Sequence, residues 1–261
     1  MLEPWAWRHK WWKKWPYFHL LEKKHLQRAA VVLATCNAEA QRLREMLPGT
    51  RVEAIALGLT SGSQPDYEAA RSALGWGSDE RILLFLSRLH AKKGLDLLLR
   101  ALAELPVPAQ TRLVVVGGGD ERYVAEVRAL AKQLETRLPR IDWRGEIWGE
   151  ARWPYFQGAD LFCLPSHSEN FGLAVLEACQ VGTPALTTRA TPWGDWLSGE
   201  RGYVGEATTE SVRELLARFF QHPPHTAEQR AQLAAWAHAE FSWDALAPRY
   251  AAIYRSAQAA H

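Results

Sequence analysis

From Arg81 onward, short apolar runs alternate with longer segments in which apolar residues recur at a helical period. The short runs are continuously apolar, which is typical of strands whose two faces are both covered by helices. Strands are expected at Ile82–Leu86, Arg112–Val116, Ile141–Arg144, Leu161–Pro165 and Pro184–Thr188. Helices are expected at Gly94–Glu104, Arg122–Glu135, Ala151–Gln157, Gly172–Val181 and Ser211–Phe220. This alternation predicts a doubly wound, parallel α/β sheet of the Rossmann-like class.

The chain on either side of this alternation has other patterns. The pattern before it predicts strands at Ala29–Thr35 and Arg51–Leu57, and helices at Ala38–Leu47 and Tyr67–Leu74. Thr60–Asp66 is rich in Ser, Gly, Gln and Pro, which is the composition of a linker, so a domain boundary is expected near residue 60. Two more helices are expected at the end, Thr226–Ala237 and Trp243–Ala257.

The first 28 residues carry the basic charge of the chain. They hold seven Lys or Arg against two Glu, a balance of +5, so the rest carries −3 and the total is +2. Tryptophans interleave with these cations, at Trp5, Trp7, Trp11, Trp12 and Trp15. This mixture suits packing against a protein surface that this chain lacks, and it also suits an anionic membrane surface.

Composition excludes several classes of protein. Hydrophobic residues make up 48% and charged residues 23%, which argues against a disordered or fibrous chain. The apolar runs fall short of the roughly 20 residues that span a bilayer, and the N-terminus lacks the apolar stretch of a secretory signal. The three cysteines show no zinc or redox spacing. A cytoplasmic location is expected, including peripheral contact with the inner face of the membrane.

The loop after the first predicted strand, residues 87–94, brings the cations Arg88 and Lys93 to the start of a helix. Ligands of doubly wound sheets bind at the carboxyl ends of the strands, where this loop is expected. Cations beside a helix N-terminus can hold an anionic group. Ordinary solvated loop residues are the alternative, which the loop by itself leaves open.

A glycine-rich turn follows the second predicted strand, with Gly117, Gly118 and Gly119 before Asp120. Missing side chains would let a ligand approach the backbone, although tight turning alone also accounts for glycine. The turn lacks the third, spaced glycine of a dinucleotide fingerprint and the Gly-Lys-Ser/Thr of a P-loop. Neither kind of nucleotide site is supported.

Two carboxylates eight positions apart follow the strand Leu161–Pro165. Glu169 is expected at the mouth of the next helix and Glu177 inside it, near an apolar face. A buried carboxylate needs partners, and the vicinal hydroxyls of a sugar or ribose suit it because it accepts two hydrogen bonds. Backbone N–H groups at Phe171–Leu173 would face a diphosphate, helped by the helix dipole.

These motifs together resemble family 4 of the glycosyltransferases. The resemblance is carried by Ser-Arg-Leu-x-x-x-Lys-Gly at residues 87–94, by Pro-Ser-x-x-Glu-x-Phe-Gly-Leu-x-x-Leu-Glu-Ala at 165–178 and by Gly-Thr-Pro at 182–184. It implies the C-terminal half of a GT-B enzyme. Residues 1–60 would be a remnant of the acceptor domain, 61–222 the Rossmann-like nucleotide-sugar-binding domain, and 223–261 C-terminal helices crossing toward the first domain. The family's first domain normally adds on the order of 150 residues.

The resemblance also implies roles for individual residues. Arg88 and Lys93 would hold the donor diphosphate and stabilise the leaving group, and Glu169 would bind the transferred sugar. Glu177 would bind the ribose. Further nucleotide-sugar contacts would come from Gly117, Gly118, Ile147, Ser166, Asn170, Phe171, Gly172 and Leu173. Asn170 stands where the family commonly has glycine, a change that Asn tolerates because it accepts left-handed backbone conformations.

The expected activity is retaining transfer of a hexosyl group from a nucleotide diphosphate sugar to a glycan or lipid-linked acceptor, as in polysaccharide or lipopolysaccharide biosynthesis. Charge stabilisation of the departing diphosphate would be the main catalytic device. The sequence has no Asp-x-Asp pair and no metal-ligand spacing among its histidines, so neither a metal nor a cofactor is expected. The alternatives are a donor-binding module that needs a separately encoded acceptor domain, and a truncated, non-catalytic relic.

We expect the N-terminal segment to bind a partner, because its strands and tryptophans leave apolar surface uncovered. A two-fold homodimer through residues 1–58 would cover this apolar surface. A separate chain carrying the N-terminal domain, or an anionic membrane surface, could also cover it. No nucleic-acid partner is expected.

Overall fold

The computed structural model describes residues 11–59, 66–197 and 199–259, so the expectations for Trp5 and Trp7 lie outside the described residues. Contacts divide the chain into two compact units, Leu59–His238 and a second unit made of Met1–Gly58 with Ala239–His261. We call the first the sheet unit and the second the terminal unit. The assignment of functional domains to 1–60, 61–222 and 223–261 stays a prediction.

Six parallel strands form the centre of the sheet unit, in the spatial order β5-β4-β3-β6-β7-β8. They are β3 (Arg81–Leu86), β4 (Thr111–Val116), β5 (Arg140–Gly145), β6 (Leu161–Leu164), β7 (Ala185–Thr188) and β8 (Gly202–Gly205). In β3, Leu83 pairs with Leu113 of β4 on one side and with Leu161 of β6 on the other. The strand order therefore reverses between β3 and β6, and doubly wound sheets bind ligands at such a switch point.

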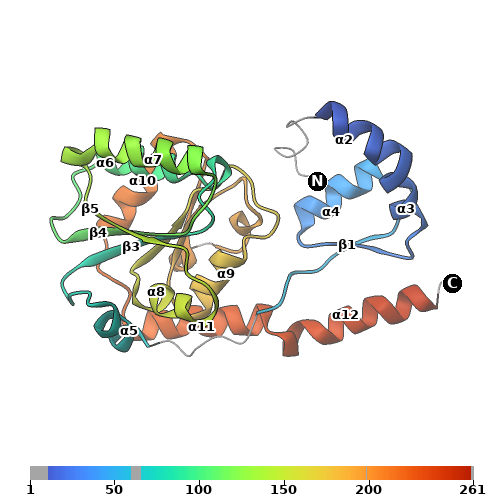
Figure 1. The fold of residues 1–261 in the computed structure, drawn as a ribbon. Coiled ribbons are helices and arrows are strands. Elements are labelled where there is room, and N and C mark those ends of the chain that lie inside the picture. The colour runs from blue at the N-terminus through green and yellow to red at the C-terminus, as the bar shows by residue number, and fades with distance from the viewer. Residues whose placement is uncertain (1–10, 60–65, 198, 260–261) are drawn as a thin grey trace. The chain divides into compact units, whose positions relative to one another are not determined.

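Helices cover both faces of this sheet (Figure 1). On one face lie α6 (Leu95–Ala103), α7 (Glu121–Gln133) and α10 (Thr209–Phe220). On the other face lie α5 (Tyr67–Leu74), α8 (Trp153–Gly158) and α11 (Ala227–Phe241), with α9 (Leu173–Gln180) beside α8. Single 3₁₀ turns occupy the connections: η2 (Ala91–Lys93), η3 (Glu135–Arg137), η4 (Gly149–Arg152), η5 (Pro192–Gly194) and η6 (Gly199–Arg201).

The predicted fold class is confirmed, because each of the five expected strands is present within one residue of its predicted ends. Their apolar runs have the predicted cause, since β4 and β6 are buried at every position. The edge strand β8 was not predicted, because glycine fills two of its four positions and weakens the strand pattern. Gly202 is needed there: a Cβ would lie 2.4 Å from the carbonyl oxygen of Ala185 on β7.

A buried ion pair fixes α5 to the amino ends of β3 and β6. Arg71 and Asp160 are 2% and 3% exposed, and Nη1 of Arg71 lies 3.2 Å from Oδ2 of Asp160. The Ile82 amide donates to the same oxygen at 2.7 Å, and the Tyr67 hydroxyl donates to Oδ1 at 2.9 Å. Burial and the nearby carboxylate raise the pKa of Tyr67 to about 12, so the phenol stays protonated and remains a donor.

The terminal unit has its own small core. Its elements are α2 (Trp11–Tyr17), the π-helical turn η1 (Phe18–Glu22), α3 (Lys23–Arg28), β1 (Val32–Ala34), α4 (Asn37–Met46), β2 (Val52–Ala54) and α12 (Trp243–Gln258). β1 and β2 pair in parallel. Phe18 is 2% exposed and packs with Leu43, Leu47 and Val52.

Two expectations for this unit need correction. Strands predicted over seven residues, Ala29–Thr35 and Arg51–Leu57, each have three, because the chain bends where α3 ends and only the centre of each run pairs. Residues 11–28 are helical, although their sequence pattern predicted no helix. Trp12 and Trp15 are 60% and 50% exposed on this run. Among the described residues, every helix is too short or too polar to cross a bilayer.

Replacing Asp160 with Ala should lower the free energy of unfolding by about 3–5 kcal/mol, because it leaves the Arg71 charge buried without its carboxylate. Urea unfolding followed by circular dichroism measures the change. Glu126→Ala is the matched control, since the Arg122–Glu126 pair is exposed and its loss should cost about 0.5 kcal/mol. Similar losses in the two variants would contradict the role given to Asp160.

Candidate functional site

Loops from four strands lie at the carboxyl edge of the sheet, around the switch point. Residues 87–94 follow β3, residues 117–120 follow β4, residues 146–152 follow β5 and residues 165–172 follow β6. All of the predicted donor-site residues lie on these loops or on α9. The fold therefore brings together segments that are far apart along the chain.

The loops after β3 and β6 are joined by their backbones. The His167 amide donates to the carbonyl of Lys92 at 2.8 Å. Gly94 has a φ of 72°, and a Cβ there would lie 2.1 Å from the carbonyl oxygen of Pro165. Residue 94 must therefore be glycine for this approach, and the approach places Lys93 opposite the β6 loop.

The glycine-rich turn after β4 packs on the β3 loop. A Cβ on Gly117 would lie 1.9 Å from the carbonyl oxygen of Ser87, and one on Gly119 would lie 1.9 Å from that of Leu89. The Leu89 amide donates to the carbonyl of Gly118 at 2.7 Å. Close packing accounts for these glycines without a ligand, so the predicted ligand contacts of Gly117 and Gly118 stay predictions.

Glu169 is held by two donors on one oxygen. Oε1 of Glu169 lies 2.6 Å from Nζ of Lys93 and accepts from Oγ of Ser166 at 2.7 Å. Glu169 is 8% exposed and Lys93 is 17% exposed, so the ion pair is largely withdrawn from water. Thr188 of β7 fixes this loop in turn by donating to the carbonyl of Ser166 at 2.5 Å. The structure thus joins three residues that the sequence had grouped, namely Lys93, Ser166 and Glu169.

Arg88 differs from Lys93 in its surroundings. Its side chain is exposed, and it forms no ion pair with any of the residues that the structure describes. His90 lies between the two cations in sequence and responds to them. Burial, then Arg88, Lys92 and Lys93, lower the pKa of His90. The neutral imidazole suits its bond, because Nδ1 of His90 accepts from the Lys92 amide at 3.1 Å.

The start of α9 is shaped by a tryptophan. Gly172 caps this helix with a φ of 83°. Nε1 of Trp193, a fully buried residue on η5, donates to the carbonyl of Phe171 at 2.5 Å. The first N–H groups of any α-helix have no partner within the helix, so the N-terminus of α9 can receive an anion. The neighbouring Asn170 and Leu173 are exposed.

Glu177 lies on α9 and pairs with an arginine from another loop. Nη2 of Arg152 is 3.0 Å from Oε1 of Glu177, and the two side chains are 22% and 19% exposed. Burial raises the pKa of Glu177, and the Arg152 guanidinium opposes this rise. Ile147 was also predicted to contact the nucleotide sugar. It is half-buried on the loop after β5 that leads to Arg152.

Sequence reasoning missed Arg152, Trp193 and Thr188. Each acts on a predicted site residue through a contact between loops, and these three carry no motif of their own. Trp193, for example, reaches the Phe171 carbonyl from 22 residues away along the chain.

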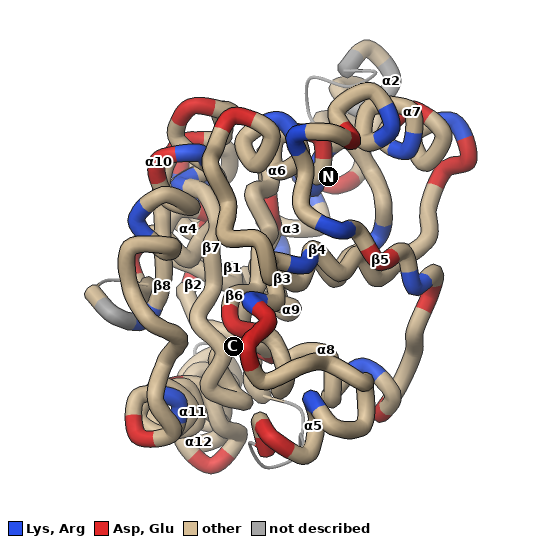
Figure 2. The backbone as a smooth tube through the Cα atoms, turned by 90° about the vertical axis from the view of Figure 1, so that its left-hand side faces the viewer, with Lys and Arg blue, Asp and Glu red and all other residues tan. Residues whose placement is uncertain are grey.

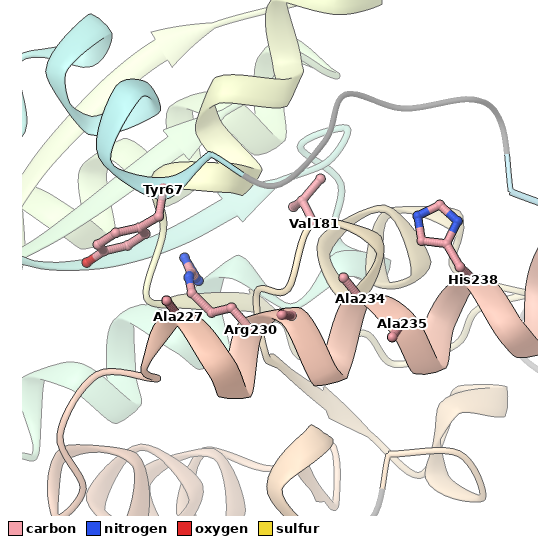
Figure 3. Close-up of a pocket in the computed structure, with 8 residues that line it drawn as sticks. Tyr67, Val181, Ala227, Arg230, Ala234, Ala235 and His238 are labelled. Atoms are coloured by element: carbon pink, nitrogen blue, oxygen red, sulfur yellow. The ribbon is translucent and has the colours of Figure 1, made fainter.

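A separate cavity of about 440 Å³ lies along α11 (Figure 3). Figure 3 shows the Arg230 side chain reaching from α11 toward Tyr67. Arg230 is 5% exposed, and both of its terminal nitrogens donate to carbonyls that precede β6 and β7, including those of Gln157 and Ala159. The guanidinium is thus used to join α11 to the amino edge of the sheet. This cavity is not at the switch point, and we assign it no ligand.

Charges of both signs are interspersed around α7, α10 and β5 (Figure 2). Among the described residues, no group of three His, Cys, Asp or Glu side chains could hold a metal ion.

Comparison with known proteins supports this reading of the fold. A sequence model of the family "Glycosyl transferases group 1" matches residues 66–237. The D-inositol 3-phosphate glycosyltransferase of Mycobacterium avium is 30% identical over 88% of this chain and 53% of its own length. That of Rhodococcus opacus is 33% identical over 79% of this chain and 48% of its own. The chain spans about half the length of these curated relatives.

Solved structures show the same architecture. Sucrose-phosphate synthase from Thermosynechococcus elongatus superposes with a TM-score of 0.80 at 25% identity, covering 93% of this chain and 62% of that one. Anabaena Alr3699/HepE, solved with UDP and glucose, gives 0.77 at 21% identity over 92% of this chain and 66% of that one, and shows the fold alone. Because the family model covers more than half of the chain and the Mycobacterium avium relative is similar over most of it, this protein belongs to the group 1 glycosyltransferases.

Proposed function

We propose that the sheet unit binds a nucleotide diphosphate sugar and is the donor half of a retaining hexosyltransferase of family 4. The observation that carries the proposal is the Lys93–Glu169 ion pair at the switch point, with Arg88 on the same loop. A cation for the diphosphate and a carboxylate for the sugar are then adjacent, on the two sides of the bond that breaks when the sugar leaves the diphosphate for an acceptor.

In this proposal Arg88 and Lys93 contact the diphosphate and stabilise the charge that develops on it as the sugar departs. The N-terminus of α9, at Phe171–Leu173, adds N–H donors to the same group. Glu169 keeps one oxygen on Lys93 and Ser166 and offers the other to hydroxyls of the sugar.

Glu177 binds the ribose in this proposal. Within the described part of the chain, its Oε1 is bonded to Arg152 and its Oε2 has no hydrogen-bond partner. A ribose hydroxyl can donate to that oxygen. The Anabaena structures contain UDP, UDP with glucose, and UDP-glucose, which supports UDP as the first nucleotide to test.

A second candidate is a donor-binding module that needs an acceptor domain from another polypeptide. It is favoured by the length of the match, about half of the curated relatives. The proposal also includes transfer of the sugar to a glycan or lipid-linked acceptor. It includes a homodimer or a separate partner bound through residues 1–58, and peripheral contact with a membrane. Hydrolysis of UDP-glucose by the purified chain, tested against other UDP-sugars, separates an active half-enzyme from a binding module.

Replacing Arg88 with Ala should weaken binding of UDP by about 1.5–3 kcal/mol, because a charge-assisted contact to phosphate is lost. Replacing Lys93 with Ala should weaken it by less, because Lys93 is already bonded to Glu169. Both changes should leave uridine binding nearly unchanged. Isothermal titration calorimetry with UDP, UMP and uridine measures this. Arg213→Ala, which removes an arginine of α10 that faces Glu104, is the control. An unaltered UDP affinity in both site variants would sink the diphosphate assignment.

The pKa of His90 should rise when Lys93 is replaced by Ala and when UDP binds to the wild type. Cations lower this pKa, so removing one, or neutralising it with a diphosphate, makes the imidazolium easier to form. NMR titration of the His90 ring signals reports both shifts. The Arg213→Ala variant should titrate like the wild type, and a fall in the pKa with UDP would contradict a diphosphate beside this loop.

Glu177→Gln should lower the affinity for UDP roughly tenfold and change that for 2′-deoxy-UDP much less, because the amide keeps the shape but loses the charge that a ribose hydroxyl meets. Calorimetry with the two nucleotides gives the ratio. Equal losses for both would remove Glu177 from the ribose.

A further inference from the structure

Arg152 connects two elements that the proposed donor site uses. It ends η4, the turn that follows the β5 loop, and its Nη2 lies 3.0 Å from Oε1 of Glu177 on α9. Its Nη1 donates to the carbonyl of Gly149 at 2.7 Å. One guanidinium therefore joins the loop after β5 to the carboxylate of α9.

The guanidinium has a fixed orientation. Its Cζ lies 4.7 Å from the ring centroid of Trp153, a residue that is 2% exposed. A guanidinium whose Cζ lies over a buried ring, and which has one nitrogen on a carbonyl and another on a carboxylate, has little freedom left to rotate. Glu177 thus meets a donor that is already in place.

This contact leaves Glu177 in a particular state. One carboxylate oxygen is occupied by Arg152, and the other has no partner within the described residues. Burial favours the protonated acid, whereas the adjacent guanidinium favours the carboxylate. Without Arg152 the side chain would lose both its fixed rotation and its main opposition to protonation.

We infer that Arg152 is a positioning residue for the nucleoside, which fixes the Glu177 carboxylate so that its Oε2 accepts from the ribose. The inference rests on the proposed function and deepens it. Arg152 acts through Glu177, and its bond to the Gly149 carbonyl holds the guanidinium in place. Lysine could supply the charge at this position, but it lacks the planar guanidinium that directs two donors to Glu177 and Gly149 at once.

The first test compares affinities for UDP and 2′-deoxy-UDP in the wild type, Arg152→Met, Arg152→Lys and the control Arg213→Met. Met keeps much of the apolar stem and removes both donors. We expect Arg152→Met to bind UDP roughly tenfold more weakly and 2′-deoxy-UDP almost as before, so that the preference for ribose collapses. Arg152→Lys should restore only part of that preference, and Arg213→Met should keep it fully.

The second readout is the pH dependence, which a merely structural role would not change. Within the described residues, Arg152 is the charged group that acts on Glu177. Its removal should raise the pKa of Glu177 further, so the UDP affinity of Arg152→Met should fall more steeply than that of the wild type as the pH is lowered. His90 and the phosphate titrate in both proteins, so the difference between the two curves isolates the effect.

A double variant, Arg152→Met with Glu177→Gln, completes the test. It should bind UDP no more weakly than Glu177→Gln alone, because both changes remove the same ribose contact. An unchanged ribose preference in Arg152→Met, or equal losses for both nucleotides, would overturn the positioning role. If the wild type bound none of UDP, ADP and GDP, the proposed function would fall and this inference with it; if ADP or GDP bound instead, its ribo and deoxy pair would serve as the probe.

Discussion

Three loops at the carboxyl edge of the sheet approach so closely that a side chain would not fit between them. A Cβ on Gly94 or Gly117 would lie 2.1 Å or 1.9 Å from a carbonyl oxygen of the facing loop, and both glycines have a positive φ. Because backbone meets backbone, the side chains that these loops carry have fixed relative positions. The 2.6 Å contact between Lys93 and Glu169 follows from that constraint.

The two edges of the sheet use buried charge in different ways. At the amino edge, both oxygens of Asp160 accept hydrogen bonds from the protein, and the Arg230 guanidinium is taken up by carbonyls. At the carboxyl edge, within the described residues, Glu169 and Glu177 each have only one oxygen engaged. A fully satisfied charge stabilises the fold, whereas a carboxylate with an oxygen to spare can still accept from a ligand.

The sequence predicted what depends on local pattern and missed what depends on pairing between distant segments. Parallel strands buried on both faces must be apolar, so the five predicted strands were found, while the glycine-containing β8 was not. The motifs named Lys93, Ser166 and Glu169 as residues of one site, and the fold brings these three side chains into contact. Arg152 meets Glu177 from 25 residues away, and no local pattern encodes that contact.

Lys93 is already bonded to Glu169, and this bond reduces the binding free energy that a diphosphate would obtain from Lys93. Arg88 would exchange only water for phosphate, whereas Lys93 would have to share or give up its contact with Glu169. The net contribution of Lys93 to binding is therefore a difference between two charge-assisted bonds, and it is smaller than the value of the bond to phosphate alone. If the proposed function holds, the same competition acts on the nucleotide diphosphate left after transfer. Glu169 then helps to release the product, because it reclaims the cation that held the leaving group.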